Sequence, residues 1–489
     1  GCLVMKHINN LEKLFNPCGV VVVGASTHPG KFGFVALHNI LSNGFEGKIV
    51  ATNPKTPKIL GIQTLSSVAE IPNDSVEAAI VCLGPEQAID VLPDLASIGV
   101  KAAFVVSGGF RESSGAGYDL ENKLVESAIS LGISIAGPNG QGFISTPARL
   151  CAQIVSPYPP AGSISIASQS GNVLSALLNH SRARNIGIAR AISIGNQAQL
   201  NVADYIRYFA KDTSTNVVIS YVEGLPDGRD FYNALSEISE RKPVIVVRGG
   251  RTSDGAKAAA SHTGSMASDH KIFETAIAQA GAISARDPEE AFDFAAAFAT
   301  QPLPKGNNVL VITTAGGWGV ITADEISKSN LNLMKLPNNL LDSIDSHLPP
   351  RWSKSNPIDL AGGETRDTIP NVISVALQHP KVDSIIFLGL GIQGNVARSY
   401  LESPLRTEET ERMANFHMSQ EKRYAESIVQ GIKDYKKPVF VASEIGITDL
   451  TNPGPSRLIE LGSMCYNSPS SAVRSLEALT KFSAMDRGG

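Results

Sequence analysis

The stretch Val20–Gly33, VVVVGASTHPGKFG, is the part of the chain that best indicates its fold. Four consecutive valines are typical of a parallel strand that is covered on both faces. The glycine-rich segment that follows opens a predicted helix, so main-chain N–H groups at this turn are able to approach a phosphate. The alternative is that these glycines serve only to turn the chain.

The same alternation of short apolar runs and helix-length segments continues almost throughout the sequence. Predicted strands of a first series are Val20–Val23, Ile49–Ala51, Ala78–Leu83, Ala102–Val106 and Ser134–Ala136. Those of a second series are Ser163–Ala167, Ile188–Ser193, Val217–Tyr221 and Val244–Arg248, followed by a helix over Pro288–Thr300. Those of a third series are Val309–Thr313, Ile385–Leu390 and Val439–Ala442. This pattern predicts an α/β protein of three doubly wound units.

Two proline-rich segments, Pro157–Pro160 and Pro302–Gly306, are predicted linkers because proline continues neither a helix nor a central strand. We therefore expect domains at residues 1–153, 154–303 and 304–489. A charged segment at 402–426 is interpreted as a solvated helix on the rim of the third domain.

Composition excludes several classes of protein. The chain has 489 residues, of which 43% are hydrophobic and 18% charged, with a net charge of −4. These values are those of an ordinary globular protein and not of a disordered chain. Because there is no basic block and no long uncharged apolar stretch, we expect no nucleic-acid partner and no membrane anchor. The 5 cysteines are scattered without a CxxC pair, which predicts no metal site and favours a reducing cytoplasm.

Two strand ends in the first series are candidate ligand-binding segments. Asn53-Pro54-Lys55 stands where a nicotinamide-dependent enzyme has an acidic residue for the ribose hydroxyls, so a phosphorylated nucleotide is favoured over NAD. Gly137–Gly142, GPNGQG, follows the last strand of this series. It is either part of the ligand crevice or a tight turn.

Ser168–Gly171 (SQSG) and Thr314–Gly319 (TAGGWG) each end a strand and open a helix, so each is a potential anion-binding helix N-terminus. A pair of such termini facing one another would hold a single phosphoryl group. The alternative for each is an ordinary strand–helix turn.

His262 and Glu223 are the candidate catalytic residues. His262 lies in ASHTGSM, within a Gly-, Ala- and Ser-rich stretch at 249–269 that is interpreted as an exposed loop. Imidazole is a competent phosphoryl acceptor near neutral pH, although most histidines are structural or merely exposed. Glu223 ends an apolar strand, where a carboxylate paired with a histidine would fix its tautomer. The alternative is a rim carboxylate bonded to the main chain.

The order of these motifs resembles the CoA-binding subunit of the nucleoside-diphosphate-forming acyl-CoA synthetases, relatives of succinyl-CoA synthetase. The similarity runs from about Leu11 to Phe482, and GRTSDGAKAAASHTGS is its most specific element. It implies a Rossmann-like CoA-binding domain followed by two flavodoxin-like domains. It also implies that His262 is phosphorylated and that Glu223 stabilises the phosphohistidine.

The resemblance assigns further site residues. Those implied for CoA are Gly24, Ser26, Pro29, Gly30, Lys31, Gly33, Asn53, Lys55, Pro138 and Asn139. Those implied for phosphate are Ser168, Gln169, Ser170, Gly171, Ala315, Gly316 and Gly317. The turn at Asn356–Asp359 is implied to lie near the phosphate site of the third domain.

The chain departs from the family pattern at Gly140-Gln141, Gln199 and Trp318, all expected near the acyl or phosphate site. The sequence has no GxxxxGK[ST] loop and leaves no room after Phe482 for the ATP-grasp module that some members carry. A separate ATP-grasp subunit is therefore implied, in an α2β2 assembly, with ATP or ADP and Mg²⁺ on that partner. The expected function is interconversion of an acyl-CoA and a small carboxylic acid through acyl phosphate and phospho-His262. The alternative is a non-catalytic CoA- or acyl-CoA-binding protein.

Overall fold

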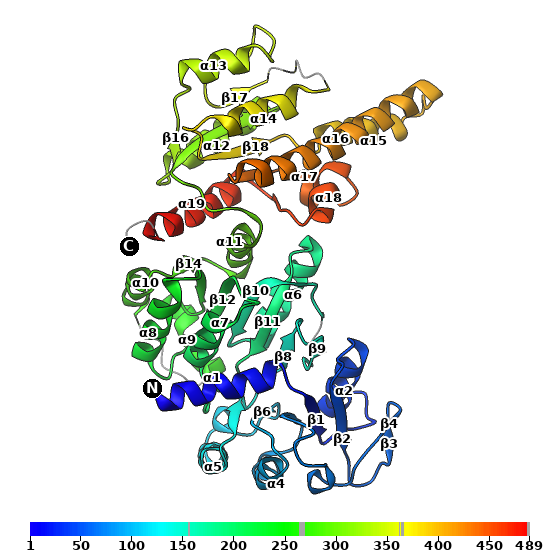
Figure 1. Ribbon diagram of the computed structural model, residues 1–489, viewed down its shortest axis with the longest axis vertical. Coiled ribbons are helices and arrows are strands. Elements are labelled where there is room, and N and C mark those ends of the chain that lie inside the picture. Colours follow the sequence, from blue (N-terminus) through cyan, green and yellow to red (C-terminus); the bar gives the residue numbers. More distant parts are fainter. Residues whose placement is uncertain (155–156, 264–268, 361, 363–365, 487–489) are drawn as a thin grey trace. The chain divides into compact units, whose positions relative to one another are not determined.

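The computed structural model describes residues 1–154, 157–263, 269–360, 362 and 366–486. The chain forms two compact units, residues 1–295 and 296–489, and each is described by itself (Figure 1). Among the described residues, no helix has the length and apolar character needed to cross a bilayer.

The first unit begins with a five-stranded parallel sheet. In spatial order its strands are β2 (Lys48–Thr52), β1 (Gly19–Val23), β5 (Ala78–Val81), β6 (Ala102–Val105) and β7 (Ser134–Ala136). Its helices are α1 (Cys2–Phe15), α2 (Phe32–Ser42), α3 (Pro85–Asp90), α4 (Leu92–Ser97) and α5 (Ala116–Leu131). A small hairpin joins β3 (Lys58–Ile59) and β4 (Ile62–Gln63).

The valines of β1 explain why an uninterrupted apolar run forms this strand. Val20 and Val22 belong to one hydrophobic core, with Leu37 of α2. Val21 and Val23 belong to another, on the opposite face of the sheet. Successive side chains of a strand point to opposite faces, so a strand covered on both sides has no polar position.

A seven-stranded sheet completes the first unit. In spatial order its strands are β14 (Ile283–Ala285), β13 (Val244–Arg248), β12 (Val217–Val222), β10 (Ala161–Ser168), β11 (Ile188–Ser193), β8 (Gly142–Ser145) and β9 (Leu150–Cys151). The last two strands are antiparallel additions: β8 pairs with β11, and β9 pairs with β8. The accompanying helices are α6 (Gly171–Arg184), α7 (Val202–Lys211), α8 (Gly228–Ser239), α9 (Ser253–Thr263), α10 (His270–Gln279) and α11 (Pro288–Thr300).

The second unit is built on one parallel sheet. Its main path is β16 (Asn332–Leu333), β15 (Asn308–Thr313), β18 (Ser384–Leu388), β19 (Val439–Ala442) and β20 (Cys465–Tyr466), and β17 (Ile358–Asp359) also pairs with β15. Its helices are α12 (Gly316–Ser327), α13 (Asn338–Asp345), α14 (Thr368–Gln378), α15 (Ile392–Leu401), α16 (Glu408–Tyr435), α17 (Ile445–Thr448), α18 (Pro453–Glu460) and α19 (Pro469–Asp486).

All three sheets share one order of their parallel strands: second, first, third, fourth, fifth. The order reverses between β1 and β5, between β10 and β12, and between β15 and β18. Ligands bind at such switch points, outside the carboxyl ends of the strands. The prediction of doubly wound units is confirmed, and the candidate motifs at Gly24, Ser168, Glu223 and Thr314 follow strands that flank a switch point.

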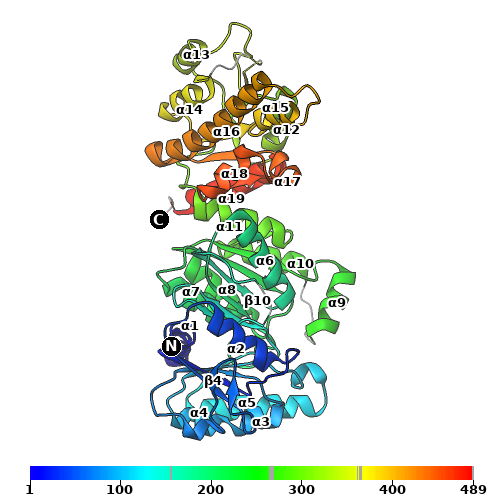
Figure 2. The same cartoon turned by 90° about the vertical axis from the view of Figure 1, so that its right-hand side faces the viewer.

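Helix α1 ties the two sheets of the first unit together, although it precedes both in sequence. Its buried face includes Leu11, Leu14 and Phe15, which share a hydrophobic core with α7. The Tyr208 hydroxyl on α7 donates to the Glu12 carboxylate at 2.6 Å. Figures 1 and 2 show α1 beside α7 in both views.

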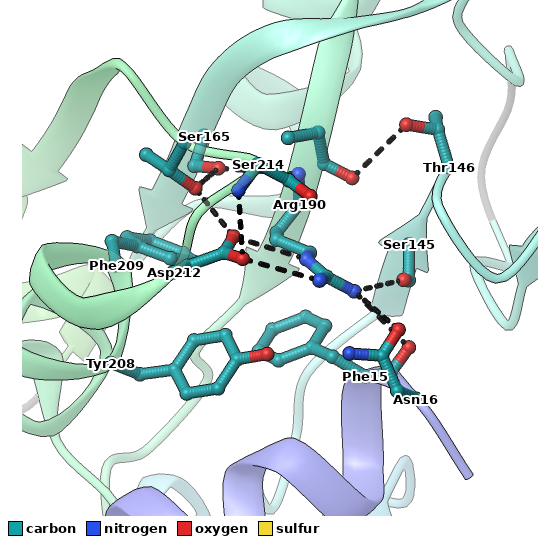
Figure 3. A network of polar contacts seen from close by, with 12 residues as sticks. Phe15, Asn16, Ser145, Thr146, Ser165, Arg190, Tyr208, Phe209, Asp212 and Ser214 are labelled. Atoms are coloured by element: carbon teal, nitrogen blue, oxygen red, sulfur yellow. Dashed lines mark hydrogen bonds and ion pairs between the residues drawn. The ribbon is translucent and has the colours of Figure 1, made fainter.

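A buried ion pair extends this connection (Figure 3). The Arg190 guanidinium on β11 donates to both carboxylate oxygens of Asp212, at 3.1 and 3.3 Å. It also donates to Ser145 Oγ at 2.6 Å and to Asn16 Oδ1 at 2.9 Å. Both charged side chains are about 5% exposed. Burial alone would raise the pKa of Asp212, but hydrogen bonds from Arg190 and Thr215 hold it below its usual value.

The segment after β11 covers the edge of the first sheet. The main-chain N–H groups of Asn196 and Ala198 donate to the carbonyls of Pro138 and Gly137, at 2.9 and 3.2 Å. Leu200 N donates to the carbonyl of Ile135 at 3.2 Å. This pairing satisfies main-chain groups at and just beyond β7, which would otherwise form an open edge.

One expectation about local structure is wrong, and a second holds except at one residue. The stretch predicted as a loop at 249–269 contains helix α9, which Figure 2 shows at the periphery of the first unit; residues 264–268 of this stretch lie outside the described residues. Its alanines favour a helix intrinsically, but because most of its residues are exposed they show no apolar period.

The charged segment at 402–426 does form helix α16, but Glu421 is buried and not solvated. Its carboxylate accepts N–H groups at the start of α15, from Gly391 at 2.8 Å and Gln393 at 2.9 Å. Burial raises the pKa of Glu421 to about 7, against the opposing effect of these bonds.

Candidate active site

His262 and Glu223 meet in the first unit. The Nδ1 atom of His262, near the end of α9, lies 2.6 Å from Oε2 of Glu223, just beyond β12. The histidine side chain is 62% exposed and the glutamate 9%. The two residues are 39 positions apart in sequence, so the pairing that the sequence left open is made by the fold.

Glu223 is held from both sides. The Tyr221 hydroxyl donates to Oε1 of Glu223 at 2.7 Å, and burial together with this bond raises the pKa of Tyr221. The main-chain N–H groups of Glu223 and Gly224 both donate to Oε1 of Gln169, at 2.7 and 3.0 Å. A Cβ on Gly249 would lie 2.5 Å from the Tyr221 hydroxyl, so the glycine leaves room for this pair.

The geometry fixes which imidazole nitrogen is available for chemistry. An ionised carboxylate only accepts hydrogen bonds, so the proton of neutral His262 lies on Nδ1. Nε2 then carries the lone pair. This is the orientation that a nucleophilic imidazole needs, with a carboxylate placed beside Nδ1 to balance a positive charge on the ring.

The N-terminus of α6 lies at the same switch point. Ser170 caps the helix by accepting from Val173 N at 3.3 Å, and Ser168 Oγ donates to the carbonyl of Ser170 at 2.6 Å. Gly171, the first helical residue, packs so closely on the Gln141 side chain that a Cβ there would overlap it. Main-chain N–H groups at this end can hold an anion.

The second unit carries the other predicted anion site. Ala315 is the N-cap of α12 and makes no side-chain cap, while Gly316 and Gly317 are exposed. A Cβ on Gly316 would lie 2.7 Å from Oδ2 of Asp359, so the turn at Asn356–Asp359 does reach this helix end. Trp318 lines a cavity of about 130 Å³ with Leu388, Ile392 and Ser443, among other residues.

The predicted CoA segment forms a tight turn after β1. Gly24 has φ +84°, and a Cβ there would lie 2.6 Å from the carbonyl oxygen of Cys82. A Cβ on Gly33 would overlap the carbonyl oxygen of Gly24, so α2 can approach the turn only with glycine at this position. Such close approach is what exposes the helix N-terminus to a phosphate.

The polar residues of this segment divide into two groups. Asn53 is structural: its Nδ2 donates to the carbonyl of Ala25 at 2.8 Å, and its Oδ1 accepts from Lys55 N at 2.9 Å. Ser26 Oγ likewise accepts from His28 N at 3.0 Å. Of the residues implied for CoA in this segment, Pro29, Gly30, Lys31 and Lys55 are exposed. Lys31 and Lys55 are the positively charged side chains among them.

The turn after β7 presents Asn139. Asn139 has φ +61°, a left-handed conformation that asparagine tolerates, and its side chain is exposed while Pro138 is buried. A Cβ on Gly140 would lie 2.6 Å from the Phe104 ring. This glycine, one of the departures from the family pattern, therefore has a large side chain packed against it.

Gln199, which was expected near the acyl or phosphate site, bonds to the main chain of the first sheet. Its Oε1 accepts the main-chain N–H of Ile135 at 2.7 Å, on the edge strand of the first sheet. Trp318 does lie in the first turn of α12, and Gln141 does lie against the N-terminus of α6.

A partly buried polar cluster beside Asn139 was not predicted from the sequence. It consists of Arg111, Glu112, Glu121 and Asn196. The first two follow β6 in SGGFRE, a polar strand end at the ligand-binding edge of the sheet, and this position was the available signal.

Comparisons with known proteins agree with this architecture. Family models match a CoA binding domain at 19–145, a succinyl-CoA ligase like flavodoxin domain at 161–298 and a Ligase-CoA domain at 309–395. The alpha subunit of acetate–CoA ligase (ADP-forming) I from Pyrococcus furiosus is 36% identical over 480 residues, which cover 97% of this chain and 98% of that one.

A 4-hydroxybutyrate–CoA ligase (ADP-forming) from Nitrosopumilus maritimus is 29% identical over 96% of this chain and 64% of its own. The solved dinucleotide forming acetyl-coenzyme A synthetase 1 of Ca. Korarchaeum cryptofilum, in complex with phosphate and ADP, matches with a TM-score of 0.85 and 34% identity over 98% of each chain. The chain belongs to the family of ADP-forming acetate–CoA ligase alpha subunits.

Proposed function

We propose that the chain is the CoA-binding, phosphohistidine-carrying subunit of an ADP- or GDP-forming acyl-CoA synthetase. The observation that carries this proposal is the 2.6 Å contact between His262 Nδ1 and Glu223, which leaves Nε2 as the phosphoryl acceptor. Both residues match those that the sequence motifs single out. The reaction interconverts acyl-CoA, nucleoside diphosphate and phosphate with the free acid, CoA and nucleoside triphosphate.

In the direction of nucleotide synthesis, a phosphate oxygen attacks the thioester carbonyl carbon. The C–S bond breaks, and CoA leaves as a thiolate that takes up a proton. His262 Nε2 then attacks the phosphorus of the acyl phosphate, the P–O bond to the acyl group breaks, and the carboxylate leaves. Finally a nucleoside diphosphate oxygen attacks the same phosphorus and the P–N bond breaks. Positioning and charge stabilisation dominate catalysis of such steps.

Each group of site residues has a part in this scheme. The N–H groups at the start of α6, with Ser168, Gln169, Ser170 and Gly171, stabilise the phosphoryl charge, and those of Ala315, Gly316 and Gly317 at α12 do the same. Lys31 and Lys55 bind CoA phosphates. Glu223 holds the phosphorylated imidazole as its charged form. The segment carrying phospho-His262 then moves to the nucleotide site.

We assign the nucleotide and its Mg²⁺ to a separate ATP-grasp subunit in an α2β2 assembly. This assignment is supported by the lack of a GxxxxGK[ST] loop and by the alpha-subunit relatives of the chain. The acid is a small carboxylic acid, as the names of the acetate and 4-hydroxybutyrate relatives suggest. We place the enzyme in a reducing cytoplasm, an assignment supported by its free cysteines.

The test is transfer of labelled phosphate to the protein in the presence of a panel of acyl-CoA thioesters. We expect an acid-labile, alkali-stable protein phosphate that is lost in His262→Ala and kept in His347→Ala, a matched change at an exposed histidine of the second unit. The assay is repeated with the ATP-grasp partner added. Label that persists in His262→Ala would refute the proposed carrier. CoA binding without any label, even with the partner, would favour a non-catalytic CoA-binding protein.

A further inference from the structure

Asn196 is the centre of the buried cluster beside the turn at Asn139. It is 8% exposed and lies just after β11, in the segment that covers the edge of the first sheet. Its main-chain N–H donates to the carbonyl of Pro138 at 2.9 Å, and its own carbonyl accepts from the Arg111 guanidinium. The Asn196 main chain is therefore fixed against the turn that presents Asn139.

The direction of the Asn196 carboxamide follows from its neighbours. Its Nδ2 donates to Oε1 of Glu112 at 3.1 Å and to Oε1 of Glu121 at 3.0 Å. A carboxylate accepts and an amide NH2 donates, so the opposite orientation would place oxygen against oxygen at both contacts. Asn196 Oδ1 must then point away from the two glutamates.

The position of the Glu112 carboxylate is fixed by hydrogen bonds from neighbouring residues. Its two carboxylate oxygens accept the main-chain N–H groups of Gly109 at 3.0 Å and Phe110 at 3.1 Å. The Ser113 hydroxyl donates to Oε2 at 3.0 Å. With these donors around it, the carboxylate is held in place as an acceptor. Glu121 is 6% exposed and lies 3.8 Å from the Arg111 guanidinium.

The orientation of the Asn196 carboxamide determines that of the Asn139 carboxamide. Oδ1 of Asn196 accepts from Nδ2 of Asn139 at 3.4 Å, which turns the amide nitrogen of Asn139 inward. Oδ1 of Asn139 is then on the outer side, where a Cβ on Gly108 would be 3.4 Å from it. Because residue 108 is a glycine, this oxygen is not covered by a neighbouring side chain at that position.

We infer that Asn196 is a positioning residue for Asn139, which the family resemblance places beside the thiol end of CoA. It fixes the Asn139 carboxamide so that Oδ1 accepts a hydrogen bond from a donor of bound CoA, either the thiol S–H or an amide N–H of the pantetheine arm. The inference rests on the proposed function of the chain. It gives the cluster of Glu112, Glu121 and Arg111 a role beyond packing: together they set which side of Asn139 faces the ligand.

The experiment compares two routes to phospho-His262 in the assembled enzyme. One starts from acyl-CoA and labelled phosphate and passes through the thiol end of the CoA site. The other starts from labelled ATP and does not. We expect Asn139→Ala and Asn196→Ala each to slow the acyl-CoA route about tenfold, the effect of losing one oriented hydrogen bond, with less than twofold change in the ATP route. Asn233→Ala, an exposed position on α8, is the matched control and should change neither.

A double-mutant cycle tests whether Asn196 acts through Asn139. If it does, adding Asn196→Ala to Asn139→Ala slows the acyl-CoA route by less than a further threefold. The inference would be overturned if the rate losses of the two single variants multiply in the double variant, or if both routes are slowed equally. Either result indicates a general structural role. The ATP route also reports whether each variant is folded. If Asn196→Ala does not fold, Asn196→Ser keeps a small polar side chain but lacks the carboxamide that orients Asn139, and the same selective loss is expected.

Binding of desulfo-CoA separates the two donors. If the thiol is the donor, Asn139→Ala weakens CoA binding but not desulfo-CoA binding. If a pantetheine amide is the donor, both weaken alike. Unchanged binding of both ligands together with an unchanged acyl-CoA route would refute the inference. A wild-type enzyme that forms no phosphohistidine by either route would instead refute the proposed function.

Discussion

Replacing Glu223 should reduce the amount of phosphoenzyme by an amount that the structure allows us to estimate. The bond from His262 Nδ1 to Glu223 is 2.6 Å long, and the carboxylate side is 9% exposed. A hydrogen bond to a charged group contributes about 1.5–3 kcal/mol, and a neutral one about 0.5–1.5 kcal/mol. Phosphorylation at Nε2 leaves the ring positively charged, so the charged part of this bond stabilises the product.

The two variants of Glu223 should therefore differ. Glu223→Gln keeps a neutral acceptor and loses about 1–1.5 kcal/mol, a roughly 5- to 15-fold fall in the ratio of phosphorylated to free enzyme. Glu223→Ala loses the whole bond, a fall of roughly 10- to 150-fold. Tyr221→Phe is the matched control: it removes the 2.7 Å bond to the other carboxylate oxygen and keeps the bond to His262. Its effect should be smaller than that of Glu223→Gln.

The assay is the fraction of labelled protein at equilibrium over a range of ratios of phosphate to free acid, together with the half-life of isolated phosphoenzyme. Thermal unfolding of each variant excludes a general loss of structure. If Glu223→Gln and Glu223→Ala both retain the wild-type phosphoenzyme level and lifetime, the carboxylate does not stabilise phosphohistidine and the reasoning is refuted.

Three further changes have expected outcomes. Arg190→Met leaves the buried Asp212 carboxylate without its partner and should lower the free energy of unfolding by about 3–5 kcal/mol in urea titrations. Because the folded pKa of Asp212 is depressed, its stabilisation is present above its usual pKa and is lost as pH falls, so the acid side of the stability profile should flatten in this variant. Gly33→Ala should abolish CoA binding in calorimetry while the second unit stays folded, since the new Cβ overlaps the turn after β1. The folded pKa of Glu421 is raised, so its ionisation costs stability as pH rises from its usual pKa to about 7, and Glu421→Gln should remove that loss in pH-dependent unfolding.

The fold was predictable because its signal lies in local composition. The valines of β1 and the similar runs after it are apolar on both faces, and each ends in glycine or a polar residue. Helix α9 was missed for the opposite reason: an exposed alanine-rich helix has propensity but no apolar period. Burial of Glu421 was missed because its partners, the N–H groups at the start of α15, are 27 to 30 residues away.

The candidate site was predictable only as separate pieces. His262, Glu223 and the N-terminus of α6 carry recognisable motifs, but the contact that joins the first two depends on how α9 returns to β12. Asn53 was assigned to ligand binding although its side chain holds the turn together. The cluster around Asn196 was missed because it unites segments 57 to 85 residues apart, and only the fold brings them together.

The position of α1 constrains how the protein is made. This helix is synthesised before either sheet of the first unit, yet its partners Arg190 and Tyr208 follow 175 to 196 residues later. The edge of strand β7 is likewise covered only after residues 196–200 have been synthesised. The first sheet is therefore completed only when much of the second has emerged, so its apolar helix and open edge remain exposed during synthesis. A fragment that ends after the CoA binding domain would keep both surfaces uncovered, and useful truncations of this protein should end after the second sheet.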